Sequence, residues 1–293
     1  MDDTTRQQAI LLYDRFTHEG MERRTFMTDM VKLAGSVAAA EILIAGIAAS
    51  PAAAAITAPN DRRLRTQTVE WPVGKGRSLK GYQAMLLPVA ERPLVLVIHE
   101  NRGLNDHIRD VTRRIALAGF TAIAPDFLTG AGGTPADEDK AREMIGSLDL
   151  ATSVSDAVAT IDWFRNRFAH KRRRIGAVGF CWGGGFVNRL AIAAGSDLDA
   201  GVVYYGPAPN PSEAPKVHAP LEFHNAGLDD RVNAGSFPWI TALRNAGKSV
   251  KFFLYDGVNH AFNNDTSAER YNKAAADLAW KRTLAFFRQH LGV

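Results

Sequence analysis

Short apolar runs alternate with helical patterns along the chain from about Arg62 onward, and this alternation constrains the fold more than any other feature. Nearly continuous Val, Ile and Leu is typical of strands that are buried on both faces of a parallel sheet. The alternation therefore predicts an α/β fold, with a mostly parallel sheet and helices on both faces. The apolar runs occupy residues 94–98, 121–124, 175–179, 201–205, 221–224 and 250–255.

Two further strands and a set of helices complete the expected domain, which covers residues 61–293. The strands, around 66–71 and 82–87, precede the apolar runs and are expected to form an antiparallel edge. A helix that begins at Asn105 or Asp106 is expected to end at Gly119. Further helices are expected at residues 137–145, 153–168, 186–194 and from about 267 to 290.

Residues 1–60 differ in character from the rest. Arg23 and Arg24 are followed by an Ala-rich stretch at 33–49 and by a run of small residues at 51–55. This order is similar to a twin-arginine export signal, which would place the protein in the periplasm. The alternative is a retained helical arm on the domain or on a partner subunit, in a cytoplasmic protein. Glu41 interrupts the apolar stretch, so no integral membrane span is expected.

Composition narrows the partners and the kinds of site. The net charge is only +4, and the basic residues are scattered apart from the run at 171–174, which is interpreted as a solvated loop. Nucleic acid is therefore not an expected partner, and a monomer or homodimer is expected. Cys181 is the single cysteine among 293 residues, which excludes an intrachain disulfide and a zinc cluster built from cysteines.

The cysteine lies in a motif that suits a nucleophile. Cys181 stands in GFCWGGG at 179–185, directly after an apolar run and before a helical pattern. A sharp strand-to-helix turn of the G-x-nucleophile-x-G type places its central side chain above the carboxyl end of the sheet. The helix N-terminus behind it stabilises a thiolate and leaves backbone N–H groups for an oxyanion. An inert buried thiol in a glycine-rich crossover is the alternative.

An acid and a histidine follow the cysteine in the order nucleophile, acid, histidine. Asp229 and His260 each follow an apolar run, so both are expected at the carboxyl ends of strands, on the same side of the sheet as the cysteine. Asp229 is favoured over Asp230 because it stands three residues before Val232, in the D-x-x-V spacing of this fold's acid loop. The sequence thus predicts a catalytic triad.

Four motifs make the chain resemble the dienelactone hydrolase family of the α/β-hydrolase superfamily, over most of the expected domain. They are IHENRGL at 98–104, APDF at 124–127, GFCWGG at 179–184 and HAF at 260–262. The resemblance implies that Glu100 contacts the resting nucleophile and is released when substrate enters. Alternatively, Glu100 forms an ion pair with Arg102 or Arg109. The oxyanion is expected to bind the backbone N–H groups of Trp182 and Asn101.

The resemblance is weaker at the substrate site. Family members that act on dienelactone hold its carboxylate with arginines, one of them four residues after the catalytic histidine, where this chain has Asn264. Arg142 is a candidate for a second such arginine. Tyr205 and Phe262 are candidates for a more apolar pocket and Asn264 is a candidate for a contact to the substrate, so dienelactone itself is not the expected substrate.

Together these features predict a cysteine-dependent hydrolase of a small ester or lactone. His260, oriented by Asp229, would accept the Cys181 proton, and the thiolate would form a thioester that water then hydrolyses. No metal or organic cofactor is implied. Two alternatives stay open: a carboxylesterase or thioesterase with the same site, and a non-catalytic scaffold whose cysteine senses oxidants.

Overall fold

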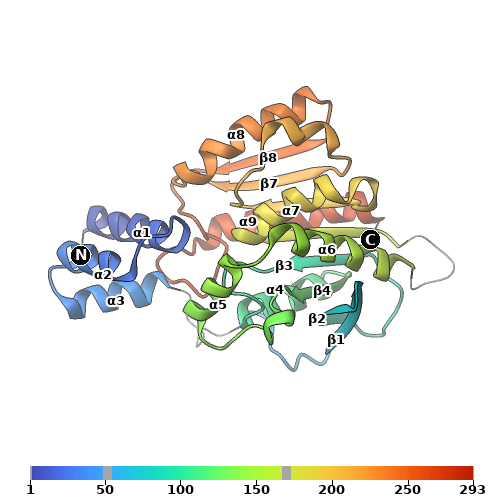
Figure 1. The fold of residues 1–293 in the computed structure, drawn as a ribbon, viewed down its shortest axis with the longest axis horizontal. Coiled ribbons are helices and arrows are strands. Elements are labelled where there is room, and N and C mark those ends of the chain that lie inside the picture. The colour runs from blue at the N-terminus through green and yellow to red at the C-terminus, as the bar shows by residue number, and fades with distance from the viewer. Residues whose placement is uncertain (1, 49–54, 167–172, 293) are drawn as a thin grey trace.

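An eight-stranded sheet with helices on both faces forms the body of the molecule (Figure 1). The computed structural model describes residues 2–48, 55–166 and 173–292. The strand order is β1-β2-β4-β3-β5-β6-β7-β8; β2 pairs antiparallel with β1 and β4, and the other neighbours run parallel. The predicted α/β class and antiparallel edge are confirmed. The strands are β1 (Leu64–Gly74), β2 (Arg77–Leu86), β3 (Leu94–Ile98), β4 (Thr121–Asp126), β5 (Ile175–Phe180), β6 (Ala200–Tyr204), β7 (Leu221–Ala226) and β8 (Val250–Tyr255).

Two groups of helices bury the two faces of the sheet. On one face, α4 (Asp106–Leu117) and α9 (Lys273–Phe287) contribute to an apolar core. On the other face, the core includes α6 (Leu150–Asn166), α7 (Trp182–Ala193) and α8 (Asp230–Asn245). Helix α5 (Glu138–Gly146) lies between α4 and α6 in the sequence.

Two helices differ from the sequence expectation. Helix α8 was not predicted, because Gly235 and Pro238 lie in its interior and both residue types disfavour a helix. Trp239 of this helix is completely buried, so packing against the sheet outweighs the local preference. The last helix was expected from about residue 267 but begins at Lys273, where the Asn272 side chain accepts from the backbone N–H of Ala275 at 3.0 Å.

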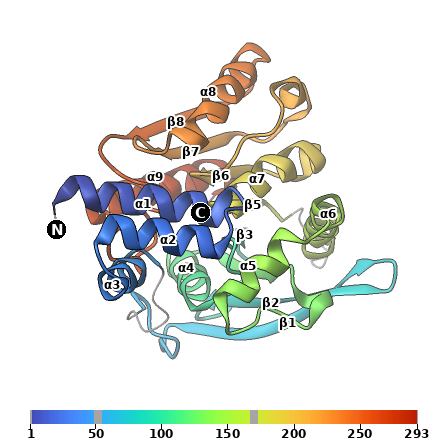
Figure 2. The ribbon, with the colours of Figure 1, turned by 60° about the vertical axis from the view of Figure 1, so that its left-hand side comes forward.

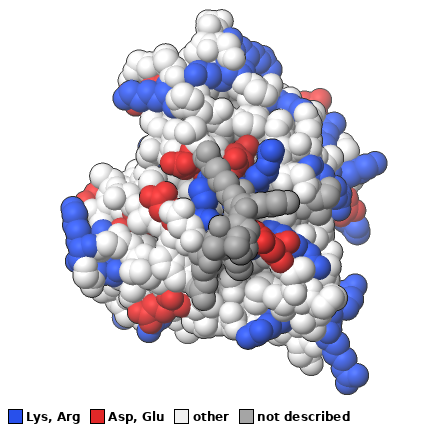
Figure 3. Space-filling view, turned by 90° about the vertical axis from the view of Figure 1, so that its right-hand side faces the viewer, with Lys and Arg blue, Asp and Glu red and all other residues white. Residues whose placement is uncertain are grey.

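Two sequence features lie partly outside the described residues: the small-residue run at 51–55 and the basic run at 171–174. Of the basic run, Arg173 is buried and donates to the carbonyl of Arg92 at 2.8 Å. The interpretation of the whole run as a solvated loop is therefore wrong for Arg173. On the face opposite the N-terminal helices, Lys and Arg side chains are interspersed with Asp and Glu (Figure 3).

Residues 3–47 form three helices that we call the arm (Figure 2). They are α1 (Asp3–His18), α2 (Arg23–Ala34) and α3 (Val37–Ile47). The arm has an apolar core of its own, in which the rings of Phe16 and Phe26 stack with centroids 4.2 Å apart. Within the described residues, no single helix is long and apolar enough to cross a membrane; α2 and α3 pass that test only together, and they are bent by 107°.

Polar contacts dock the arm against the rest of the chain. Arg270 binds the Asp14 carboxylate at 3.2 Å and the carbonyl oxygen of Ile47 at 3.1 Å. Arg142 of α5 donates to the carbonyl of Phe16 at 3.1 Å and lies over the ring of the same residue. These contacts place the end of α1 over the loops that follow the parallel strands.

Candidate active site

The turn between β5 and α7 holds Cys181 in a backbone conformation that is unusual for a residue with a side chain, with φ 54° and ψ −116°. Such conformations cost on the order of 1–3 kcal/mol. Glycines make the turn possible: a Cβ on Gly179 would lie 2.0 Å from the carbonyl oxygen of Gly183, and one on Gly183 would lie 2.4 Å from that of Ile98. The thiol therefore sits at the end of β5, as the motif predicts.

Asp229 and His260 reach this turn from the loops after β7 and β8. Asp229 Oδ2 lies 2.5 Å from His260 Nδ1, and its Oδ1 accepts from the backbone N–H of Val232 at 3.1 Å. Asp230, the alternative acid, is exposed. The other ring nitrogen of His260, Nε2, is buried and has no hydrogen-bond partner among the described residues. One side of the imidazole is thus fixed, and the other is free to react.

Burial and charge act against each other on this pair. Burial lowers the pKa of His260, but the Asp229 carboxylate and the negative charge that Cys181 carries once it is a thiolate outweigh burial and raise this pKa to about 10. Burial raises the pKa of Asp229, but His260, Arg231 and the Val232 N–H bring it below its usual value. Both directions favour an imidazolium beside a carboxylate. His260 is therefore well suited to accept a proton.

A second histidine, His18 at the end of α1, approaches the same thiol. Its Nε2 lies 3.9 Å from Cys181 Sγ, and its ring is edge-on to that of His260 with centroids 4.9 Å apart. Loss of water around the ring lowers the pKa of His18 well below its usual value, and the charge on His260 acts in the same direction. The donor atoms of His18, Cys181 and His260 all lie within 4.8 Å of one another, so these residues could hold a metal ion.

Glu100 lies in the same cavity and is fixed by Asn264. The Asn264 side chain donates to Glu100 Oε2 at 2.8 Å, whereas Oε1 is buried without a hydrogen-bond partner in the described residues. Arg102 and Arg109, the two alternative partners of Glu100, lie near other carboxylates. Asn264, which was predicted to contact substrate, therefore positions Glu100 in this state of the site.

Of the two residues whose backbone N–H groups are predicted to bind the oxyanion, Trp182 directly follows Cys181 and Asn101 lines the same cavity as the thiol. Trp182 is the first residue of α7, so its N–H has no acceptor within the helix. Asn101 lies in the loop after β3 and lines the cavity, and its side chain donates to the carbonyl of Thr17 at 3.4 Å. Thr17 of the arm thus contacts the loop whose Asn101 N–H is one of the two predicted oxyanion donors.

The remaining predicted substrate residues are not among those that line the cavity in the described chain. Arg142 contacts the arm instead. Tyr205 and Phe262 are fully buried, and the Tyr205 ring centroid lies 4.9 Å from that of His260 and 5.5 Å from that of Phe262. Tyr205 therefore packs against His260, and Phe262 packs against Tyr205.

The cavity at the thiol is small because the arm covers it. Its volume is about 30 Å³, which is room for only one or two water molecules. The sequence had not indicated that Tyr13, Thr17 and His18 of the arm, or Arg270, line this cavity. The lining consists of Tyr13, Thr17, His18, Glu100, Asn101, Arg102, Cys181, His260, Ala261, Asn264 and Arg270.

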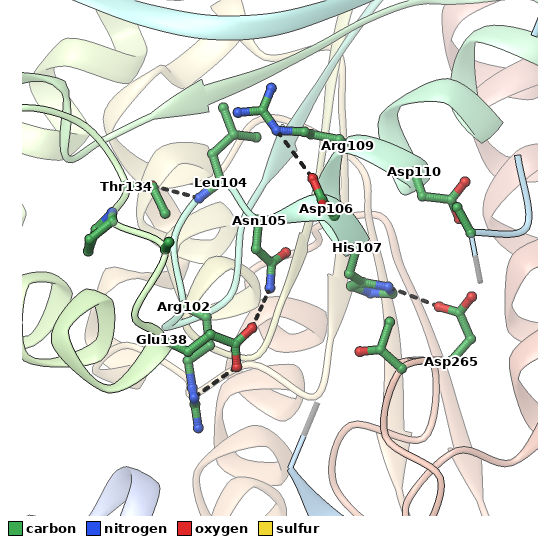
Figure 4. A pocket seen from close by; sticks show the side chains of 14 residues that line it. Arg102, Leu104, Asn105, Asp106, His107, Arg109, Asp110, Thr134, Glu138 and Asp265 are labelled. Atoms are coloured by element: carbon green, nitrogen blue, oxygen red, sulfur yellow. Dashed lines mark hydrogen bonds and ion pairs between the residues drawn. The ribbon is translucent and has the colours of Figure 1, made fainter. Parts of the chain in front are cut away.

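A larger cavity of about 360 Å³ shares Arg102 with the first (Figure 4). Its polar residues are largely paired with one another: Glu138 binds Arg102 at 3.0 Å and Asn105 at 3.3 Å. His107 Nδ1 lies 2.9 Å from a carboxylate oxygen of Asp265. Several polar side chains of the larger cavity are thus engaged with one another, whereas Cys181 and His260 line the smaller cavity.

Comparison with known proteins identifies the family of the chain. Residues 80–291 match the Dienelactone hydrolase family. The chain belongs to this family. It is accordingly a hydrolase of the dienelactone hydrolase type, in the class of carboxylic ester hydrolases, as the four motifs predict.

Curated relatives of the dienelactone hydrolase family cover most of the chain. A protein of Methylorubrum extorquens that bears the name "Putative carboxymethylenebutenolidase" is 30% identical over 259 residues, which are 83% of this chain and 88% of that protein. Protein usf of Aquifex pyrophilus is 32% identical over 223 residues, which are 74% of this chain and 95% of that protein.

Solved structures confirm the α/β-hydrolase fold. The structure titled "Putative Dienelactone Hydrolase" from Klebsiella pneumoniae superposes with a TM-score of 0.68 at 27% identity, covering 77% of this chain and 99% of its own. Brefeldin A esterase, at 13% identity, shares the fold with a TM-score of 0.63 and covers 90% of this chain and 86% of its own.

Proposed function

We propose that this family member hydrolyses a small ester or lactone with Cys181 as nucleophile, His260 as base and Asp229 as the group that orients the base. The observation that carries the proposal is the buried Asp229–His260 pair, whose free Nε2 belongs to the same small cavity as the thiol. The strained elbow and the family membership support it.

The mechanism follows from these positions. His260 accepts the thiol proton, and the thiolate attacks the carbonyl carbon of the substrate. The oxyanion accepts hydrogen bonds from the N–H groups of Trp182 and Asn101. The tetrahedral intermediate collapses to a thioester on Cys181, and the leaving alcohol takes the proton from His260. A water molecule, deprotonated by His260, then attacks the thioester carbonyl; the C–S bond breaks, the acid leaves, and the Cys181 thiolate takes the proton back from His260.

Glu100 protects the thiol between turnovers. A carboxylate near Cys181 disfavours the thiolate by like-charge repulsion. When a substrate carbonyl displaces Glu100 from the cavity, that repulsion falls and the thiolate forms. Asn264 is the residue that holds Glu100 in its resting place.

Arg270 supports a substrate with a negative group. It lines the cavity and binds the Asp14 carboxylate of the arm at 3.2 Å, so it is already placed to bind a carboxylate. Because the cavity has no room for an ester while the arm is docked, substrate entry requires the arm to move, and this movement frees Arg270. Asn264 replaces one family arginine, and Arg270 supplies a cation from a different position.

The assignment of the nucleophile is tested with Cys181→Ala on short aryl esters and small lactones. We expect kcat/KM to fall by about 10³-fold or more, because the acyl-enzyme cannot form. His218→Ala, at an exposed histidine outside the cavity, is the control and keeps its activity. Turnover retained in Cys181→Ala would disprove the mechanism.

The substrate charge is tested by the ratio of two rates. Arg270→Ala loosens the arm for every substrate, so only the ratio of kcat/KM for a carboxylate-bearing ester to that for its neutral methyl ester isolates the charge. We expect this ratio to fall by roughly 10–100-fold in the variant, the effect of a lost charge-assisted hydrogen bond. An unchanged ratio would show that Arg270 does not bind the substrate.

A further inference from the structure

Three segments that are far apart in the sequence bring nitrogen and sulfur donors to one point. His18 ends helix α1 of the arm, Cys181 lies on the elbow after β5, and His260 lies in the loop after β8. Their donor atoms are within 4.8 Å of one another, and His18 Nε2 is 3.9 Å from the sulfur. The hydrolytic mechanism uses the thiol and His260 but gives His18 no task.

His260 has the surroundings of a metal-binding histidine. Its Nδ1 is held by Asp229 at 2.5 Å, and its buried Nε2 has no hydrogen-bond partner among the described residues. Histidines that ligate metals typically donate their second ring N–H to a carboxylate, which fixes the ring and strengthens the ligand. Nε2 is therefore held in a fixed orientation in the cavity that also contains the Cys181 thiol.

One cysteine and two histidines suit a zinc ion. Zinc binds thiolate sulfur at about 2.3 Å and imidazole nitrogen at about 2.0–2.1 Å in tetrahedral sites, which sets the donors roughly 3.3–3.6 Å apart. The donor atoms lie within 4.8 Å of one another, which exceeds this spacing by up to about 1.5 Å, a difference that side-chain rotation can close. Three protein ligands leave the fourth position of the ion to a water molecule.

The charges in the cavity are compatible with a cation. Glu100 lines the cavity with one carboxylate oxygen unpartnered in the described residues. The two arginines of the lining are already paired, Arg102 with Glu138 at 3.0 Å and Arg270 with Asp14 at 3.2 Å. The zinc ion would therefore have a carboxyl group nearby, while the guanidinium groups of Arg102 and Arg270 are engaged with carboxylates of their own.

We propose that His18, Cys181 and His260 bind one zinc ion, which blocks the nucleophile and fastens the arm over the cavity. On binding, Cys181 and His260 release the protons of the thiol and of the imidazolium to solvent, and the thiolate and two neutral imidazoles coordinate the ion. The blocking of turnover rests on the proposed function, whereas the binding of zinc does not. The site exists only while the arm is docked, so zinc couples arm position to activity.

Binding is tested on the full-length protein after it has been stripped with EDTA and desalted. The protein is mixed with Zn²⁺, desalted again and analysed for metal. We expect about one zinc ion per chain in the unaltered protein and in the control His218→Ala, and less than about a tenth of this in His18→Ala and Cys181→Ser. Loading with Co²⁺ should give a thiolate-to-cobalt charge-transfer band that is missing in Cys181→Ser.

Inhibition is measured on the same proteins. The quantity compared is the rate of ester turnover without Zn²⁺ divided by the rate with micromolar Zn²⁺. The ratio is expected to be large in the unaltered protein, to return to one on addition of EDTA, and to lie near one in His18→Ala. Zinc retained by His18→Ala, or no zinc in the unaltered protein, would disprove the site and leave the hydrolase mechanism intact. Stoichiometric zinc in a protein without ester turnover would disprove the mechanism and support the site.

Discussion

Among single residues, Asp229 allows a test in which shape is kept and charge is removed. Asp229→Asn removes the negative charge that raises the pKa of His260 and favours the wrong tautomer of the ring. We expect kcat/KM on aryl esters to fall by about 10³–10⁴-fold, measured by steady-state kinetics, without loss of the folded structure. Asp230→Asn is the matched control because Asp230 is the exposed neighbour. Equal losses in the two variants would contradict the assignment of the acid.

The elbow glycine Gly179 is a second single residue with a sharp expectation, here for stability. A Cβ in Gly179→Ala would lie 2.0 Å from the backbone oxygen of Gly183, and backbone cannot move as a flexible side chain does. We expect the free energy of unfolding to fall by about 3 kcal/mol or more, measured by urea denaturation. In the control Gly146→Ala, the Cβ meets no atom within 4 Å, and stability should be unchanged or slightly higher. Equal urea midpoints would show that the turn is not tightly packed.

The sequence indicated some site residues and not others for a physical reason. Cys181, Asp229 and His260 each follow a strand in the parallel part of the sheet, and the end of a strand fixes a residue's position in the sheet. His18 has no such reference point, since it lies 163 residues before the cysteine it approaches and its position depends on tertiary docking alone. Arg270 was missed for the same reason.

At the level of elements, the contact between α5 and α1 distinguishes two roles for Arg142. The sequence suggested that Arg142 binds the substrate, whereas its guanidinium donates to the Phe16 carbonyl at 3.1 Å in the arm. If Arg142 holds the arm, Arg142→Ala should lower KM for neutral aryl esters about threefold to tenfold, because an open arm admits substrate more often. Steady-state kinetics measures this change.

The control for Arg142 is Arg15 of the arm, which forms an exposed ion pair. Arg15→Ala removes a contact of 3.5 Å with Glu19, and exposed pairs of this kind contribute little. Its KM should stay unchanged. A rise in KM for Arg142→Ala, limited to carboxylate-bearing esters, would instead favour substrate binding by this residue.

Strands were easier to predict than helices in this chain. The inner parallel strands such as β3, β5 and β6 are buried on both faces, so their apolar runs are nearly continuous and stand out from the polar loops. Helix α8 does not stand out, because Gly235 and Pro238 weaken its local preference, and burial of Trp239 against the sheet compensates only in the folded protein. The end of α6 was expected at residue 168, beyond the described residues.

For the whole molecule, the sequence left the first 60 residues open between an export signal and an arm. Composition could not decide, since an Ala-rich apolar stretch suits both, and the docking contacts join residues as distant as Asp14 and Arg270, 256 positions apart. The structure describes how the arm docks; whether the segment is also an export signal is a separate property. A contact between residues so far apart leaves no local pattern in the sequence.

The docked arm predicts that Cys181 is poorly accessible in the full-length chain. The residue is 5% exposed and its cavity holds only one or two water molecules. A variant that begins after residue 55 should react with iodoacetamide at least about tenfold faster, since even 1.4 kcal/mol of arm docking gives a factor of ten. The rate is followed by mass spectrometry of the single thiol.

The part of the chain that this variant keeps resembles a complete fold. The structural relative from Klebsiella pneumoniae has 99% of its own chain covered by 77% of this one.

A point variant keeps this prediction independent of the truncation. Phe26→Ala removes a ring that is 2% exposed in the core of the arm and does not line the cavity, and such a change costs about 3–5 kcal/mol of local packing. The arm should then open more often, and alkylation should accelerate while the urea midpoint of the sheet domain stays the same. Met27→Ala, at a partly buried neighbour, should have a smaller effect. If alkylation were equally slow in the unaltered chain, the truncated chain and Phe26→Ala, the protection of the thiol would arise from the catalytic loops themselves, and the arm would not control access.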